Sequence, residues 1–116
     1  MIHLALYDVR NTGMPREVPS MGVSRPRYTI AVLEGDGIGP EIMAEAVKVL
    51  KALESESVHF ELRYALFGGS AYFKTGSAFP EETVAICDAA DAILKGPIGL
   101  SYVESKRIPI DQQPER

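Results

Sequence analysis

The most constraining feature of this chain is a charge-free apolar run at 28–33 (YTIAVL) that leads directly into a glycine-rich turn at 34–39 (EGDGIG). Tyrosine, threonine, isoleucine and valine favour extended backbone, and a run without charge is typical of a strand that is covered on both faces. Pro40 suits the first turn of a helix because its φ is already fixed near the helical value. The residues that would then share one helical face are Met43, Ala46, Val47, Leu50 and Leu53. The sequence therefore predicts a strand, a tight turn and a helix.

Strands and helices continue to alternate along the chain. Apolar side chains recur at every second position over 58–66, which predicts a strand with one face more buried than the other. The remaining predicted elements are a short helix over 71–74, a helix from 80 to about 89, and a strand over 92–94. This order predicts an α/β fold, a mostly parallel sheet with flanking helices. In such sheets ligands bind beyond the carboxyl ends of the strands, here in the loops that begin at Gly35 and Gly96.

The two ends of the chain lack this periodicity. Residues 1–27 contain scattered prolines and glycines and are predicted to be a flexible extension, so that the folded part would comprise residues 28–116. Residues 99–116 are polar, contain Pro109 and Pro114, and are predicted to be a loop. Because ordering such a loop requires packing partners that this chain does not supply, we expect residues 28–116 to be the amino-terminal part of a longer domain.

Composition excludes several classes of protein. The net charge is −4 and the lysines and arginines are scattered, so no nucleic-acid partner is expected. No apolar run approaches the roughly 18 residues that a membrane span requires. Cys87 is the only cysteine, which excludes an internal disulfide and fits a cytoplasmic protein.

Four residues with reactive or charged side chains have a structural interpretation that we prefer to a functional one. Asp36 and Asp91 stand alone, whereas Mg²⁺ or Mn²⁺ requires several converging oxygens, so we expect a turn residue and a strand-start residue. Cys87 lies on the apolar face of a predicted helix and is expected to be a small buried hydrophobe. Lys95 could point into a ligand cleft, but a solvated lysine is the simpler expectation.

The stretch 35–41 (GDGIGPE) is the most informative one for function. Glycines at alternate positions allow backbone to approach a ligand where a strand leads into a helix, and they equally suit a purely structural turn. The stretch is not the dinucleotide fingerprint G-x-G-x-x-G, because Pro40 occupies the place of the third glycine. The residues alone leave both interpretations open.

The sequence resembles the isocitrate and isopropylmalate dehydrogenase family, whose members carry the same seven residues at this place. Segments similar to the isopropylmalate branch follow at comparable spacing: 67–71 (FGGSA), 75–77 (TGS), 79–83 (FPEET), 90–99 (ADAILKGPIG) and 111–116 (DQQPER). Glu34 and 95–97 (KGP) are closer to isocitrate dehydrogenases, and Leu100 replaces a glycine that is frequent in the isopropylmalate branch. Isocitrate, tartrate and homoisocitrate dehydrogenases therefore remain alternatives.

This resemblance implies the oxidative decarboxylation of a 2-hydroxy acid, 3-isopropylmalate in leucine biosynthesis, with NAD and with Mg²⁺ or Mn²⁺. It also implies that the segment 99–115, by composition a solvated loop, lies along the nicotinamide side of the bound NAD. The cofactor-binding residues carried over are Ile38, Gly99, Leu100, Asp111, Gln112, Gln113, Pro114 and Glu115.

The family's catalytic residues and metal ligands lie later in the chain, so no residue here is assigned to either role. We therefore expect the 116-residue chain alone to be inactive, and the full-length enzyme to be a homodimer. The resemblance further implies that carboxyl-terminal strands complete the first domain, so an isolated 1–116 fragment is expected to aggregate or fold partly. A non-catalytic remnant or regulatory subunit of the same family is the alternative from another class. An unrelated nucleotide-binding α/β module is a third.

Overall fold

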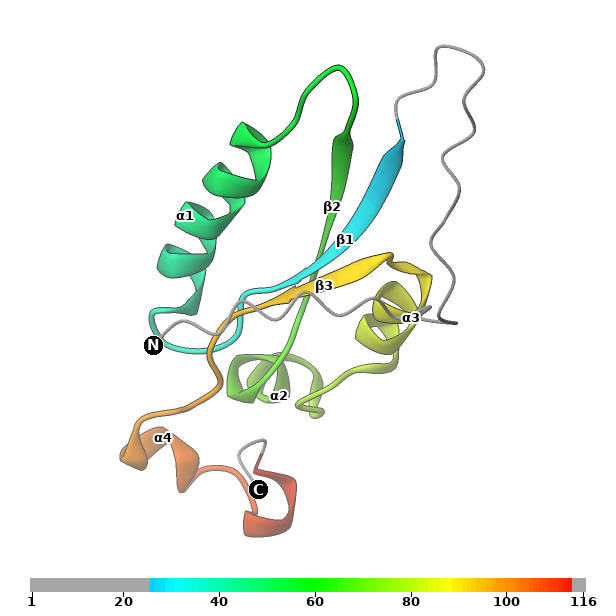
Figure 1. The fold of residues 1–116 in the computed structure, drawn as a ribbon. Helices are drawn as coiled ribbons and strands as arrows, with labels where there is room; N and C mark the ends of the chain where they lie inside the picture. Colours follow the sequence, from blue (N-terminus) through cyan, green and yellow to red (C-terminus); the bar gives the residue numbers. More distant parts are fainter. Residues whose placement is uncertain (1–25, 114–116) are drawn as a thin grey trace.

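A computed structural model describes residues 26–113 as a three-stranded parallel sheet with helices on its two faces (Figure 1). In chain order the elements are β1 (Arg27–Leu33), α1 (Gly39–Ala52), β2 (His59–Ala65), α2 (Gly69–Thr75), α3 (Glu81–Ala89), β3 (Ala92–Lys95), α4 (Tyr102–Ser105) and the 3₁₀ helix η1 (Ile110–Gln112). This arrangement confirms the predicted fold class. None of the helices in the described range is long and apolar enough to cross a lipid bilayer.

Strand β1 is the centre of the sheet, with β2 on one side and β3 on the other. It pairs with β2 along its whole length, from Arg27 opposite His59 to Leu33 opposite Ala65, and with β3 over its last four residues. The side chains of residues 30–33 are all buried, as a strand covered on both faces requires. Within residues 26–113, β2 and β3 form the two edges of the sheet.

The alternation of side chains along β1 divides the core into two clusters. Ile30 and Val32 face α1 and pack with Met43 and Leu50, among others. Ala31 and Leu33 point to the opposite face, where the buried residues are Cys87 and Ala90, at the end of α3. Burial raises the pKa of the Cys87 thiol, with a smaller contribution from the neighbouring Asp88. The interpretation of Cys87 as a buried hydrophobe is therefore confirmed.

Several predicted boundaries and buried positions differ from the structure. Strand β1 begins at Arg27, and residues 1–25 of the predicted extension lie outside the described residues. Leu53 was predicted on the packed face of α1, but it follows the last helical residue and is 61% exposed. Tyr64, near the carboxyl end of the edge strand β2, and Leu66, just after it, are also exposed.

The prediction of an unpacked loop over 99–116 is wrong for its central part. Ser101 caps α4: its hydroxyl accepts a hydrogen bond from the Glu104 N–H, and the Glu104 carboxylate accepts one from the Ser101 N–H. Ile108 is buried, and the Gln113 side-chain amide donates to the carbonyl oxygens of Ser105 and Ile108. Polar composition alone predicts a loop here, but the buried Ile108 and the side-chain hydrogen bonds of Ser101 and Gln113 hold the segment in place.

Candidate cofactor-site loops

Three loops meet beyond the carboxyl ends of the parallel strands. They are residues 34–38 after β1, 66–68 after β2, and 96–101 after β3. Backbone groups make some of their contacts: Asp36 N–H donates to the Pro97 carbonyl at 3.0 Å, and Gly96 N–H donates to the Leu33 carbonyl at 2.7 Å. Because the strands are parallel and adjacent, residues more than 60 positions apart in the sequence are brought together at this edge.

The loop after β1 requires glycine at its first turn position. Gly35 has a φ of +78°, a conformation that side-chain-bearing residues rarely adopt. A Cβ at Gly35 would also lie 1.9 Å from the Pro97 carbonyl oxygen, which is backbone and cannot rotate away. The structural interpretation of the glycine motif therefore accounts for this position without a ligand.

The Asp36 carboxylate joins the loop after β1 to the start of α2 and to the loop after β3, an arrangement that we call the Asp36 clasp. Its Oδ2 accepts hydrogen bonds from the N–H groups of Gly69 at 2.9 Å and Gly99 at 3.2 Å, and its Oδ1 accepts one from Ser70 at 2.7 Å. The Ser70 hydroxyl in turn donates to the Gly35 carbonyl at 3.1 Å. Asp36 is only 3% exposed, so these bonds replace its contact with water.

The hydrogen bonds of the clasp decide the ionisation of Asp36. Burial raises the pKa of this carboxyl, but the N–H groups of Ser70, Gly69 and Gly99 together outweigh burial, and the pKa lies below its ordinary value. Since the folded-state pKa is lowered, the stabilisation is complete above the ordinary carboxyl pKa and is lost as pH falls through the folded-state value. At neutral pH the clasp therefore contains a carboxylate. Asp36 does lie in the turn, as the sequence predicts, but its carboxylate also binds two distant segments, which the sequence does not predict.

Three of the residues predicted to bind a cofactor lie at these loops. Ile38 is at the start of α1 and is 63% exposed. Gly99 is exposed, and its carbonyl oxygen is 4.0 Å from where a Cβ of Gly37 would lie, so the two loops are neighbours. Leu100 packs against Gly69, at which an added Cβ would lie 2.2 Å from the Leu100 Cδ1.

The remaining predicted cofactor residues belong to the carboxyl-terminal segment. Asp111 is exposed, and the Gln112 side-chain oxygen accepts a hydrogen bond from the Tyr72 hydroxyl at 2.9 Å. Gln113 has its side-chain amide engaged as described above, whereas Pro114 and Glu115 lie outside the described residues. The amides of Gln112 and Gln113 therefore hold this segment against α2 and α4, and their role toward a cofactor stays a prediction.

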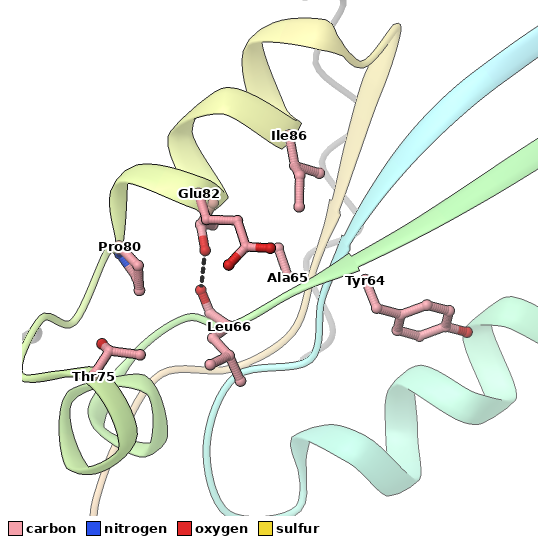
Figure 2. Close-up of a pocket in the computed structure, with 8 residues that line it drawn as sticks. Tyr64, Ala65, Leu66, Thr75, Pro80, Glu82 and Ile86 are labelled. Atoms are coloured by element: carbon pink, nitrogen blue, oxygen red, sulfur yellow. Dashed lines mark hydrogen bonds between the residues drawn. The ribbon is translucent and has the colours of Figure 1, made fainter.

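A surface hollow of about 270 Å³ lies between the carboxyl end of β2 and α3, and Leu66 of the loop after β2 borders it (Figure 2). Its lining residues are Tyr64, Ala65, Leu66, Thr75, Pro80, Glu82, Thr83 and Ile86. The Thr83 hydroxyl donates to the Leu66 carbonyl at 2.7 Å, which ties α3 to the end of β2. The lining contains one acidic side chain, that of Glu82, and no basic one, so it offers no positive charge to bind an anionic cofactor.

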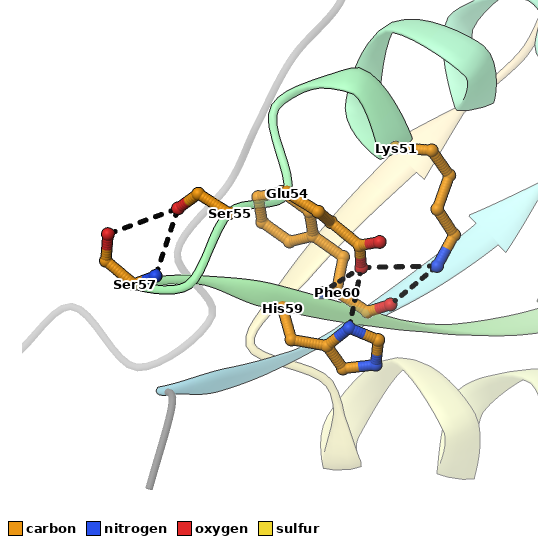
Figure 3. Close-up of polar contacts among 6 residues, drawn as sticks. All are labelled: Lys51, Glu54, Ser55, Ser57, His59 and Phe60. Carbon is orange, nitrogen blue, oxygen red and sulfur yellow. Dashed lines mark hydrogen bonds and ion pairs between the residues drawn. The ribbon is translucent and has the colours of Figure 1, made fainter. Parts of the chain in front are cut away.

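A second group of polar contacts lies at the other end of β2 (Figure 3). The Glu54 carboxylate accepts a hydrogen bond from the Phe60 N–H at 2.7 Å and lies 2.8 Å from His59 Nδ1 and 3.3 Å from Lys51 Nζ. The Phe60 N–H, with smaller contributions from Lys51 and His59, holds the pKa of Glu54 below its ordinary value. These contacts fasten the end of α1 to β2.

Across residues 26–113, no three His, Cys, Asp or Glu side chains converge as a metal site would need.

Comparison with known proteins identifies the family. Residues 29–115 match the sequence profile described as isocitrate/isopropylmalate dehydrogenase. This chain belongs to that family. The 3-isopropylmalate dehydrogenase of Geobacter sulfurreducens is 53% identical over 90 residues, which cover 77% of this chain and 24% of that protein. The 3-isopropylmalate dehydrogenase of Aquifex aeolicus is 48% identical over 91 residues, or 78% of this chain and 24% of that protein.

A solved structure agrees with this placement in the isocitrate/isopropylmalate dehydrogenase family. The apo β-decarboxylating dehydrogenase of Thermococcus kodakarensis superposes with a TM-score of 0.53 at 39% sequence identity, covering 65% of this chain and 22% of that chain. The chain spans about a quarter of the length of the curated relatives named above.

Two features of this site were not predicted from the sequence. The Asp36 clasp could not be, because its donors are backbone groups that a sequence does not reveal. The cap of α4 could have been, since Ser101 and Glu104 have the S-x-x-E spacing of a capping box.

Proposed function

We propose that the native protein is an NAD-dependent 3-isopropylmalate dehydrogenase and that residues 27–113 supply one wall of its NAD site. The observation that carries this proposal is the 53% identity to the 3-isopropylmalate dehydrogenase of Geobacter sulfurreducens. The proposal includes a homodimer and a place in leucine biosynthesis.

The loops at the carboxyl edge of the sheet suit the nicotinamide side of NAD. Ile38 presents an exposed apolar side chain there, and Gly99 leaves the adjoining backbone uncovered by a side chain. A planar ring and its ribose can lie against such a surface, at the edge where parallel sheets bind ligands. NAD would supply hydride acceptance when bound, and these residues would orient its ring.

The described residues do not fit the divalent metal that the family resemblance implies. No cluster of three potential ligands exists among residues 26–113. Asp36 is committed to three N–H groups, which leaves it poorly suited to coordinate a cation. We therefore assign no step of the reaction to a metal held by this part of the chain.

Isocitrate is the main alternative substrate, because Glu34 and 95–97 resemble isocitrate dehydrogenases. The Lys95 ammonium lies 5.5 Å from the centre of the Phe67 ring and donates to the Gly96 carbonyl at 3.3 Å. The Glu34 carbonyl oxygen lies 2.2 Å from where a Cβ of Gly96 would stand, so Glu34 contributes a close backbone approach. These local contacts account for Lys95 and for the glycine at position 96, which weakens the alternative, whereas the Glu34 contact involves only backbone and has no bearing on its side chain.

Substrate preference tests the proposal. The native gene product, assayed for NAD reduction in the presence of magnesium, is expected to use 3-isopropylmalate with a kcat/KM about 100-fold above that for isocitrate, since an apolar group recognised by the site discriminates on this scale. Preference for isocitrate would contradict the proposal in favour of the other branch. Reduction of NAD with neither acid would favour a non-catalytic member of the family.

Gly69→Ala tests whether Leu100 contacts NAD. The added Cβ would lie 2.2, 2.3 and 2.6 Å from the Cδ1, Cγ and Cδ2 atoms of Leu100, so the whole Leu100 side chain would have to move to another rotamer. The φ of Gly69 is not in the left-handed region, so its backbone accepts alanine. We expect the KM for NAD to rise roughly fivefold, as for the loss of one apolar contact, with little change in stability. Lys74→Ala, at the exposed end of the same helix, is the matched control and should leave the KM unchanged. An unaltered KM for NAD in Gly69→Ala would mean that Leu100 does not contact NAD.

A further inference from the structure

The Asp36 side chain does more than the turn around it requires. The turn itself is held by backbone bonds, from Asp36 N–H to the Pro97 carbonyl and from Gly39 N–H to the Asp36 carbonyl, which any residue could make. The carboxylate instead reaches two other segments, 33 and 63 positions away in the sequence. The specific requirement for an aspartate at position 36 must therefore lie in its contacts with those two segments.

The three donors match a carboxylate and no other side chain of this size. Two acceptor oxygens without a proton can serve three N–H groups, whereas an amide or hydroxyl presents a donor to at least one of them. Gly68 adds a steric condition, because a Cβ there would lie 2.6 Å from the Asp36 Oδ2. The clasp is thus closely enclosed, with its oxygens directed at the start of α2 and at Gly99.

Of the segments in the clasp, the one at Gly99 leads directly into the proposed NAD contacts. Gly99 lies two residues after Pro97, whose carbonyl accepts the Asp36 N–H, and it precedes Leu100, whose side chain packs on Gly69. The position of Leu100 therefore depends on Gly99 before it and on Gly69 beneath its side chain, and the Asp36 carboxylate binds the N–H groups of both.

We propose that Asp36 is a positioning residue for NAD: by holding Gly99 and Gly69 together, it fixes the backbone and side chain of Leu100 in the conformation that accepts the nicotinamide side of the cofactor. This inference rests on the proposed function. Asp36 does not touch the cofactor itself, because it is buried beneath the loops. Its removal should therefore act on cofactor affinity more than on turnover.

A matched pair of variants separates positioning from stability. Asp91 also accepts a backbone hydrogen bond, from the Thr29 N–H at 2.9 Å, but it precedes β3 at the amino-terminal end of the sheet. In the native protein, Asp36→Asn is expected to raise the Kd for NAD, measured by calorimetry, roughly tenfold, because a hydrogen bond to a charged acceptor is lost. The KM for NAD should rise in parallel, with kcat changed less than about threefold. Asp91→Asn should lower the Tm but leave the Kd and KM for NAD unchanged.

Each outcome decides the proposal. If Asp36→Asn lowers the Tm but binds NAD as tightly as wild type, or if Asp91→Asn weakens NAD binding equally, Asp36 is merely structural and the inference is overturned. Wild-type protein that does not bind NAD would instead defeat the proposed function. Should Asp36→Asn fail to fold, hydrogen exchange of the wild-type protein without NAD decides. A protected Gly99 amide supports the clasp, and exchange at the unprotected rate overturns it.

Discussion

Replacing Gly35 with alanine is expected to destabilise the protein by roughly 4 kcal/mol, among the largest effects that a single added methyl group can have. Two physical terms act at this position. The φ of +78° is strained for alanine, and the new Cβ would lie 1.9 Å from the Pro97 carbonyl oxygen. The loops after β1 and β3 would have to separate, which would also break the bond from Asp36 N–H to Pro97. Urea denaturation of the native protein measures the loss.

Gly76→Ala is the matched control for that variant. Gly76 has a similar φ of +80°, but no atom lies within 4 Å of the position that a Cβ would take. Only the backbone term remains, so we expect a loss of about 1 kcal/mol. Equal losses at Gly35 and Gly76 would mean that the close approach of the two loops does not contribute.

Leu94→Ala is expected to cost about 3 kcal/mol, through lost burial and the cavity left behind. Leu94 is 1% exposed and lies in β3, where it belongs to the cluster that α1 covers. Leu53→Ala removes the same atoms from a side chain that is 61% exposed and should change the free energy of unfolding by less than about 0.5 kcal/mol. A large loss of stability in Leu53→Ala would instead mean that Leu53 is packed, as the helical spacing in the sequence predicts.

The sheet and its order of elements could be predicted because their signals are local. The uncharged run at 28–33 and the helical spacing from Met43 to Leu50 each indicate one element, and the observed β1 and α1 contain them. Burial at the ends was harder to predict. Leu53 continues the helical spacing, yet the helix ends at Ala52, and no periodic pattern reports where a helix stops contacting the sheet.

The site could be predicted only where side chains or known motifs carry the signal. The glycine motif indicated a close backbone approach, and Gly35 makes one. The three donors of the Asp36 clasp come from backbone N–H groups that the fold brings together, so residue types alone could not indicate them. The side chains of Gln112 and Gln113 hold the carboxyl-terminal segment in place, but no sequence motif specifies these contacts either.

A crystal structure of the native protein with NAD bound tests the central claim most directly. The proposed site predicts that the nicotinamide side of NAD contacts Ile38, Gly99 and Leu100, with the Asp36 clasp intact beneath them. Binding of NAD without contact to these three residues, for example at the hollow between β2 and α3, would contradict the claim.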